Sequence, residues 1–111
     1  SNCNPYIADL FEIDLIRKKH RLTILDALRV QYHRGPSYHP QWNDQSNKLV
    51  FGLDPVAVDT VGWKLVEDLR AKKGLPSLPE ERRQPAYLKT AEDLGLGQSR
   101  LENIEIIEEE V

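Results

Sequence analysis

The stretch LVFGLDPVAVDTVGWKLVEDLRAKKG in the middle of the chain constrains the fold more than any other segment. An apolar run ends at Asp54, Pro55 follows, and apolar residues then recur three or four positions apart. Asp is a favoured N-cap residue, and Pro suits the first helical position because its missing N–H would have no partner there. We therefore expect a strand over residues 48–53 that leads directly into a helix over residues 55–73, which Gly74 ends.

Weaker sequence patterns in the rest of the chain indicate two more helices and two more strands. We expect helices over residues 5–18 and 85–94, a strand that begins near Arg21 and ends at Asp26, and a last strand over residues 103–111. The first of these strands contains LTIL, a continuously apolar run that is typical of a strand covered on both faces. Gly95 and Gly97 follow a helix instead of opening one, so a helix stop and a turn are a better interpretation of them than a phosphate loop.

The order of these elements predicts an α/β fold. The connection between the last two strands is long enough for a right-handed crossover, which implies that they are parallel neighbours. We therefore expect a small, mainly parallel sheet of about three strands with three helices. A sheet this narrow suggests a fragment of a larger α/β domain.

Composition excludes several classes of protein. Hydrophobic residues make up 40% of the 111 residues and charged residues 30%, as in a folded domain, and the net charge of −3 gives no support for nucleic-acid binding. No apolar run approaches the ~18 residues of a membrane span. The one cysteine, Cys3, cannot by itself hold an iron–sulfur cluster, so we expect none in this chain.

The chain contains no methionine, and Ser1-Asn2 resembles the remnant of a removed tag. We therefore interpret residues 1–2 as such a remnant and residues 3–111 as a single α/β domain, the C-terminal portion of a longer protein. Any N-terminal targeting signal would then lie outside this chain, which leaves the compartment open.

Three aspartates are candidates for chemistry, each with a structural alternative. Asp54 could cap the following helix or bind a hard cation. Asp59 lies on the shoulder of the apolar helical stripe, so it needs a backbone N–H or an arginine as partner, or else shares a site with the other two. Asp26 could cap a loop, or it could lie where α/β proteins place their active sites, at the carboxyl end of a strand.

The connection over residues 31–47 is long and rich in aromatic residues, which is unusual without a function. His33 and His39 are six residues apart, which is no standard zinc spacing, so surface histidines are the simpler interpretation. Gly35 precedes a proline and marks a turn, although glycine also lets backbone approach a ligand. We find no GxxxxGK[ST], GxGxxG, GxSxG or HExxH motif.

Three segments together resemble a known family: LTILDALRVQYHRGP, LVFGLDPVAVDTVGWKLVE and AEDLGLGQSRLENIEII. In this order they are similar to the C-terminal part of the bacterial and archaeal family called domain of unknown function 362. Members of that family often carry a ferredoxin-like module, so the resemblance implies an iron–sulfur module as a partner, besides the rest of the parent protein. It also implies Asp26, Gly35, Asp54 and Asp59 as site residues. The family's second glycine after Gly-Pro is missing here.

Two functions follow from these features. The leading hypothesis is a polar cleft beyond the strand ends for a divalent cation or a small ligand, with Asp26, Asp54 and His33 as metal ligands. The alternative is a non-catalytic module in which Tyr32, Tyr38 and Trp42 dock the missing N-terminal half or an iron–sulfur redox partner.

Overall fold

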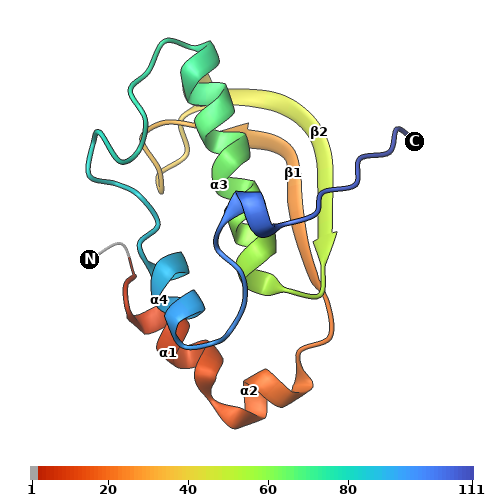
Figure 1. Cartoon of the computed structure of the whole chain (residues 1–111). Coiled ribbons are helices and arrows are strands. Elements are labelled where there is room, and N and C mark those ends of the chain that lie inside the picture. The colour runs from red at the N-terminus through yellow and green to blue at the C-terminus, as the bar shows by residue number, and fades with distance from the viewer. Residues whose placement is uncertain (1–2) are drawn as a thin grey trace.

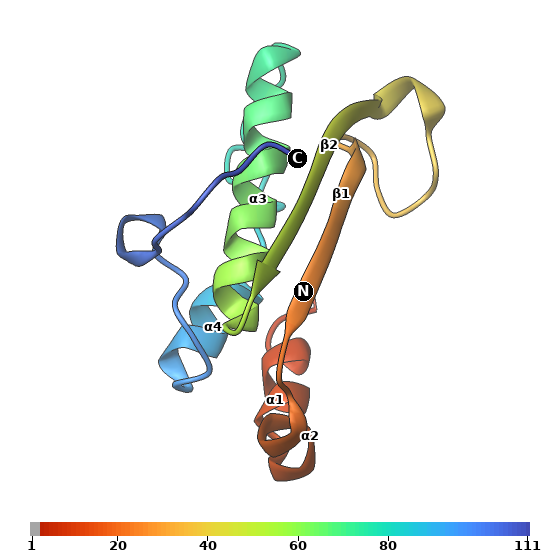
Figure 2. The same ribbon diagram turned by 90° about the vertical axis from the view of Figure 1, so that its right-hand side faces the viewer.

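The computed structural model describes residues 3–111, so the predicted tag remnant at residues 1–2 lies outside the described residues. Its helices and strands are α1 (Tyr6–Glu12), α2 (Asp14–Lys19), β1 (Thr23–Gln31), the 3-10 helix η1 (Pro40–Trp42), β2 (Asn43–Gly52), α3 (Pro55–Lys72), α4 (Tyr87–Asp93) and the 3-10 helix η2 (Leu101–Asn103). The two strands form one layer and α3 lies against them as a second layer (Figures 1 and 2).

The sheet is an antiparallel pair of strands, with Thr23 opposite Gly52 at one end and Gln31 opposite Asn43 at the other. The prediction of a mainly parallel sheet of about three strands is therefore wrong. The expected third strand at residues 103–111 begins with the last residue of η2 and continues without strand structure, so residues 3–111 contain no crossover that would make neighbouring strands parallel. Between β1 and β2 the chain turns back without a covering helix, which gives antiparallel pairing.

The first predicted helix, residues 5–18, is two short helices. The chain is extended at Ile13, with φ −57° and ψ 124°, and this residue separates α1 from α2. Its apolar positions have correct helical spacing, but Leu10 and Leu15 are 58% and 65% exposed because no other element covers them. The described chain thus has four α-helices in place of the three expected.

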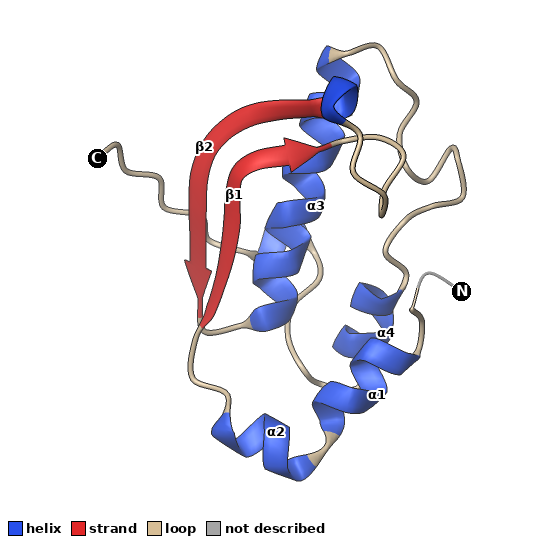
Figure 3. Ribbon diagram, turned by 180° about the vertical axis from the view of Figure 1, so that it is seen from behind, coloured by secondary structure: helices blue, strands red, loops and turns tan. Residues whose placement is uncertain are grey.

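The hairpin is bent by a β-bulge between Ala27 and Arg29, and Figure 3 shows the strong curvature of both strands. On the β2 side the bulge includes Asn47, whose φ of 56° is in the left-handed region that Asn tolerates better than most residues. The Asp26 carboxylate accepts a hydrogen bond from the Leu28 N–H at 3.0 Å. Asp26 therefore lies inside β1, where it stabilises the bulge, and not at the end of the strand as predicted.

Only one face of the hairpin is covered. Ala27 is buried and Leu25 reaches α3 at Gly62, where a Cβ atom would lie 2.9 Å from the Leu25 side chain. Side chains alternate across a strand, so Ile24 and its partner Phe51 lie on the opposite face. These two are 57% and 60% exposed. The continuously apolar run LTIL predicted a strand covered on both faces, but within residues 3–111 only one face is covered.

α3 confirms the strongest sequence prediction. Asp54 is its N-cap, Pro55 its first residue, and Gly74 follows its end with a φ of 73°. With 18 residues it is the longest element. No helix among residues 3–111 has both the length and the apolar composition for crossing a membrane.

The core lies where α1, α3 and α4 meet. Ala8, Val56, Leu88 and Ala91 are buried there, one or two from each helix, and the partly buried Trp63 packs against them. Figure 1 shows α1 and α4 side by side near the start of α3. This small core and the covered face of the hairpin are joined through α3, which contributes to both.

The Asp54 carboxylate also holds the C-terminal segment in place. One oxygen accepts the Ala57 N–H at 3.0 Å, and the other accepts the Gln98 N–H at 2.8 Å. Gly97 makes this contact feasible, because a Cβ atom there would overlap the carboxylate and lie 2.8 Å from Val56 Cβ. Gly97 therefore permits a close backbone approach.

We predict that Gly97→Ala lowers the free energy of unfolding by about 1–3 kcal/mol, the usual cost of overpacking a tight contact. Gly35→Ala is the matched control, since a Cβ atom at Gly35 would have no atom within 4 Å. Urea denaturation followed by circular dichroism measures both. Equal stability of the two variants would show that Gly97 is not closely packed against Asp54.

Candidate binding cleft

The residues predicted to form a cation site are not brought together. Because the strands are antiparallel, β2 ends beside the start of β1, so Asp54 lies at one end of the hairpin and Asp26 within it. Both Asp54 oxygens already accept backbone N–H groups. Among the described residues there is no group of three or more His, Cys, Asp or Glu side chains that could hold a metal ion.

A cleft of about 430 Å³ lies between β1, α3 and the segment that leads into α4; we call it the strand cleft. Its lining includes Leu25, Asp26, Ala27, Arg29, Val30 and Gln31 of β1, together with Asp59, Gly62, Trp63, Leu65 and Val66 of α3 and Leu78, Arg83, Pro85 and Tyr87 beyond it. Neighbouring β1 residues alternate between the two faces of the sheet, so this cleft follows the edge of the strand.

One side of α3 forms the opposite wall. Asp59, Gly62, Trp63 and Val66 have helical spacing and share this wall. The Leu25 side chain of β1 packs against Gly62, where a Cβ atom would lie 2.9 Å from it. The indole N–H of Trp63 is buried and has no hydrogen-bond acceptor within residues 3–111. Indole is a donor only, so this group fits a ligand that offers a carbonyl or another acceptor.

Asp59 and Tyr87 are paired in the cleft wall, with the phenol oxygen 3.2 Å from a carboxylate oxygen of Asp59. Burial raises the pKa of Asp59, although the hydrogen bond from Tyr87 opposes this shift. Burial, with the nearby Asp59 charge, raises the pKa of Tyr87 to about 12. The native state therefore holds the Asp59 proton more tightly than the unfolded chain, and stability falls as pH rises through the raised pKa.

A second cavity of about 290 Å³ adjoins the strand cleft near the carboxyl end of β1; we call it the basic pocket. It is lined by Gln31, Tyr32, His33, Arg34, Gly35, Val66, Arg70, Leu78, Arg83, Pro85 and Tyr87. Six of these also line the strand cleft: Gln31, Val66, Leu78, Arg83, Pro85 and Tyr87. The two cavities are thus adjacent parts of one hollow, and the second contains three arginines.

Arg70 is 1% exposed and organises the wall of the basic pocket. Its Nε donates to the Pro76 carbonyl and its Nη1 to the Tyr32 carbonyl, both at 2.9 Å. Its buried Nη2 lies 3.0 Å from a carboxylate oxygen of Glu81 and forms an ion pair with it. Arg70 therefore ties β1, α3 and the 75–81 segment together.

The histidines and the glycine of the 31–47 connection have structural contacts. His33 Nδ1 lies 3.3 Å from Arg70 Nη1, and because a guanidinium only donates, Nδ1 accepts and the ring proton is on Nε2. The His33 ring also stacks edge-on against Trp42 with centroids 5.0 Å apart. The Gly35 carbonyl accepts from Arg83 at 3.1 Å. Of the aromatics predicted to dock a partner, Tyr32 is buried and Tyr38 is 73% exposed.

Sequence reasoning missed Arg70, Arg83 and Tyr87. A signal existed for Arg70, because it follows Val66 by four positions on the apolar stripe of α3, where a charged residue needs a buried partner. However, Arg70 also lies in the last turn of the helix, where a cation is favourable because of the helix dipole, and this gave a simpler interpretation. Tyr87 and Arg83 follow a polar, proline-rich connection, and no spacing rule places their side chains beside Asp59 or Gly35.

Comparison with protein-family models, with curated proteins and with solved structures gave no match. The resemblance to domain of unknown function 362 therefore stays a prediction from the sequence motifs.

We predict that the phenol of Tyr87 ionises with a midpoint near pH 12, which is visible as the difference in phenolate absorbance between the wild type and Tyr87→Phe during an alkaline titration. In Asp59→Asn the midpoint moves down, because the carboxylate charge that opposes phenolate formation is gone. A midpoint at the ordinary value of 10.0, unchanged by Asp59→Asn, would contradict the pairing.

Proposed function

We propose that this chain is a non-catalytic docking module that receives an extended segment of another polypeptide along the free edge of β1. One observation carries this proposal: β1 has β2 as its one strand neighbour in residues 3–111, and the strand cleft runs along its other edge. A strand edge carries backbone N–H and C=O groups without partners and is a ready template for an added strand.

The cleft has the chemistry for such a segment. Val66 of α3 lines the strand cleft and provides an apolar surface for a side chain of the incoming strand. The Trp63 indole N–H lacks an acceptor within the described chain, and a backbone carbonyl would supply one. Main-chain hydrogen bonds would give affinity here, and the α3 wall would select the side chains.

The exposed apolar face of the hairpin supports the same function. Ile24, Leu49 and Phe51 are each more than half exposed on the face that points away from α3. A two-stranded sheet with one covered face is marginal by itself, and further strands or a packed layer stabilise it. A partner that extends the sheet at β1 would be well placed to cover this face as well.

The partner class follows from the sequence resemblance. We propose the rest of a longer parent protein as the docked polypeptide, with an iron–sulfur module as the second candidate. We do not propose a divalent-cation site in the polar cleft. That hypothesis required Asp26 and Asp54 to end two parallel strands that meet at one edge of the sheet.

Selection from a random 12-residue peptide library against the purified 111-residue chain tests the proposal. We expect enriched peptides with alternating apolar residues, whose binding shifts the amide NMR signals of β1 and of the α3 wall. Val66→Asp places a charge on the apolar α3 wall of the cleft and should weaken these peptides at least about tenfold, the effect of losing roughly 1.4 kcal/mol.

Lys64→Asp is the matched control, because it introduces the same side chain two positions away on an exposed part of α3. It should leave peptide affinity unchanged. Peptides that bind both aspartate variants equally well, or that shift signals away from β1, would contradict docking at this edge.

A further inference from the structure

We infer that the basic pocket is a binding site for a small oxyanion, a phosphate or a carboxylate, held by Arg34, Arg70 and Arg83. This inference goes beyond strand docking and does not depend on it, since the ligand is a small ion and the pocket lies past the carboxyl end of β1. A volume of about 290 Å³ is near the lower end of the range for small-ligand sites.

The charges of the pocket favour an anion. Its lining contains three guanidinium groups and the ring of His33, and it contains no carboxylate. Glu81 contacts Arg70 from outside the lining residues and offsets one of the three positive charges. Asp59 lines the strand cleft but not the basic pocket. Two positive charges are left without an opposing carboxylate in the lining.

Arg70 makes this a built site instead of a group of surface cations. It is 1% exposed and fixed by two backbone carbonyls, so its guanidinium is already oriented before any ligand arrives. Its buried Nη2 is paired with Glu81 at 3.0 Å, so Arg70 contributes a fixed charge to the wall, while the exposed Arg34 and Arg83 supply the donors that reach the anion. A guanidinium presents donors in a planar fork that matches the oxygens of phosphate and carboxylate groups.

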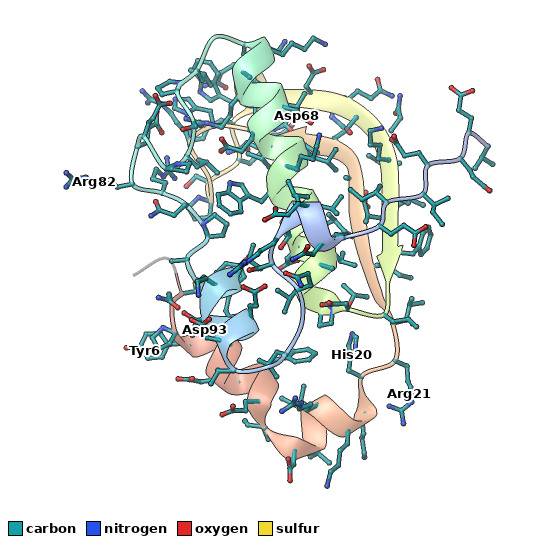
Figure 4. All side chains as sticks on the ribbon, in the orientation of Figure 1. Tyr6, His20, Arg21, Asp68, Arg82 and Asp93 are labelled. Atoms are coloured by element: carbon teal, nitrogen blue, oxygen red, sulfur yellow. The ribbon has the colours of Figure 1, made fainter. Side chains whose placement is uncertain are left out.

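Two exposed arginines would close over the anion. Arg83 uses one nitrogen to bond the Gly35 carbonyl, which holds it at the pocket and leaves its other donors available. Arg34 has a φ of 60° and lines the same pocket from the connection that follows β1. In contrast, the neighbouring Arg82 projects away from the molecule (Figure 4). Arg82 is therefore an internal control for Arg83, because it is the adjacent arginine but lies outside the pocket.

NMR titration of the ¹⁵N-labelled 111-residue chain with inorganic phosphate at constant ionic strength tests the inference, with malonate as a second arm and sodium chloride as the reference. We expect saturable shifts of the amides of residues 33–35 and of the Arg70 Nε–H signal. The arm that saturates at lower concentration tells whether phosphate or carboxylate is the preferred chemistry.

Arg34→Gln and Arg83→Gln should each weaken binding about tenfold, as expected for the loss of a hydrogen bond from a charged group. Arg82→Gln should leave it unchanged. The side chains of Arg34 and Arg83 are both exposed, so we expect both variants to keep the fold. Arg34→Gln in addition removes no hydrogen bond that the structure shows. Shifts that do not saturate, that equal those with chloride, or that persist in both variants would overturn the inference.

Discussion

A sheet of two strands has two open edges and two faces, and a single helix can cover one face. This constraint shapes the rest of the molecule. α3 covers the face that carries Ala27, and the bulge stabilised by Asp26 curves the hairpin around it. The other face keeps its apolar side chains in solvent, and the edge of β1 opens into the strand cleft. The binding surfaces proposed here are consequences of what one helix leaves uncovered.

Three polar anchors hold this incomplete architecture together. Asp54 joins the start of α3 to the C-terminal segment through two backbone N–H groups. Arg70 joins the end of β1 to the segment after α3, and Asp59 joins α3 to α4 through Tyr87. Each anchor satisfies backbone or side-chain groups in partly buried surroundings, where unpaired polar groups are costly.

The sequence predicted α3 and its cap because those features are local: a capping aspartate, a proline and a helical stripe lie within twenty residues. It did not predict strand direction, which depends on whether distant segments pair. The pattern NIEIIEEEV has the alternation of a strand, yet this segment does not pair with β2 as a strand, and without that pairing the crossover argument fails. The continuously apolar run LTIL predicted a strand covered on both faces, which is wrong for residues 3–111, because Ile24 is 57% exposed and its partner Phe51 60%. Among the candidate site residues, Asp59 lines a cleft and His33 and Gly35 a pocket, but Asp26 and Asp54 are occupied by backbone N–H groups.

The central claim is that β1 is bonded along one edge and open along the other. Amide hydrogen exchange of the free chain, resolved by NMR over residues 23–27, measures this directly. In an antiparallel pair the N–H groups of successive residues point to opposite edges, so we predict slow exchange at alternate residues, where N–H groups face β2, and fast exchange at the residues between them. Slow exchange at every one of these residues would show that the outer edge of β1 already has a partner, and would contradict the account.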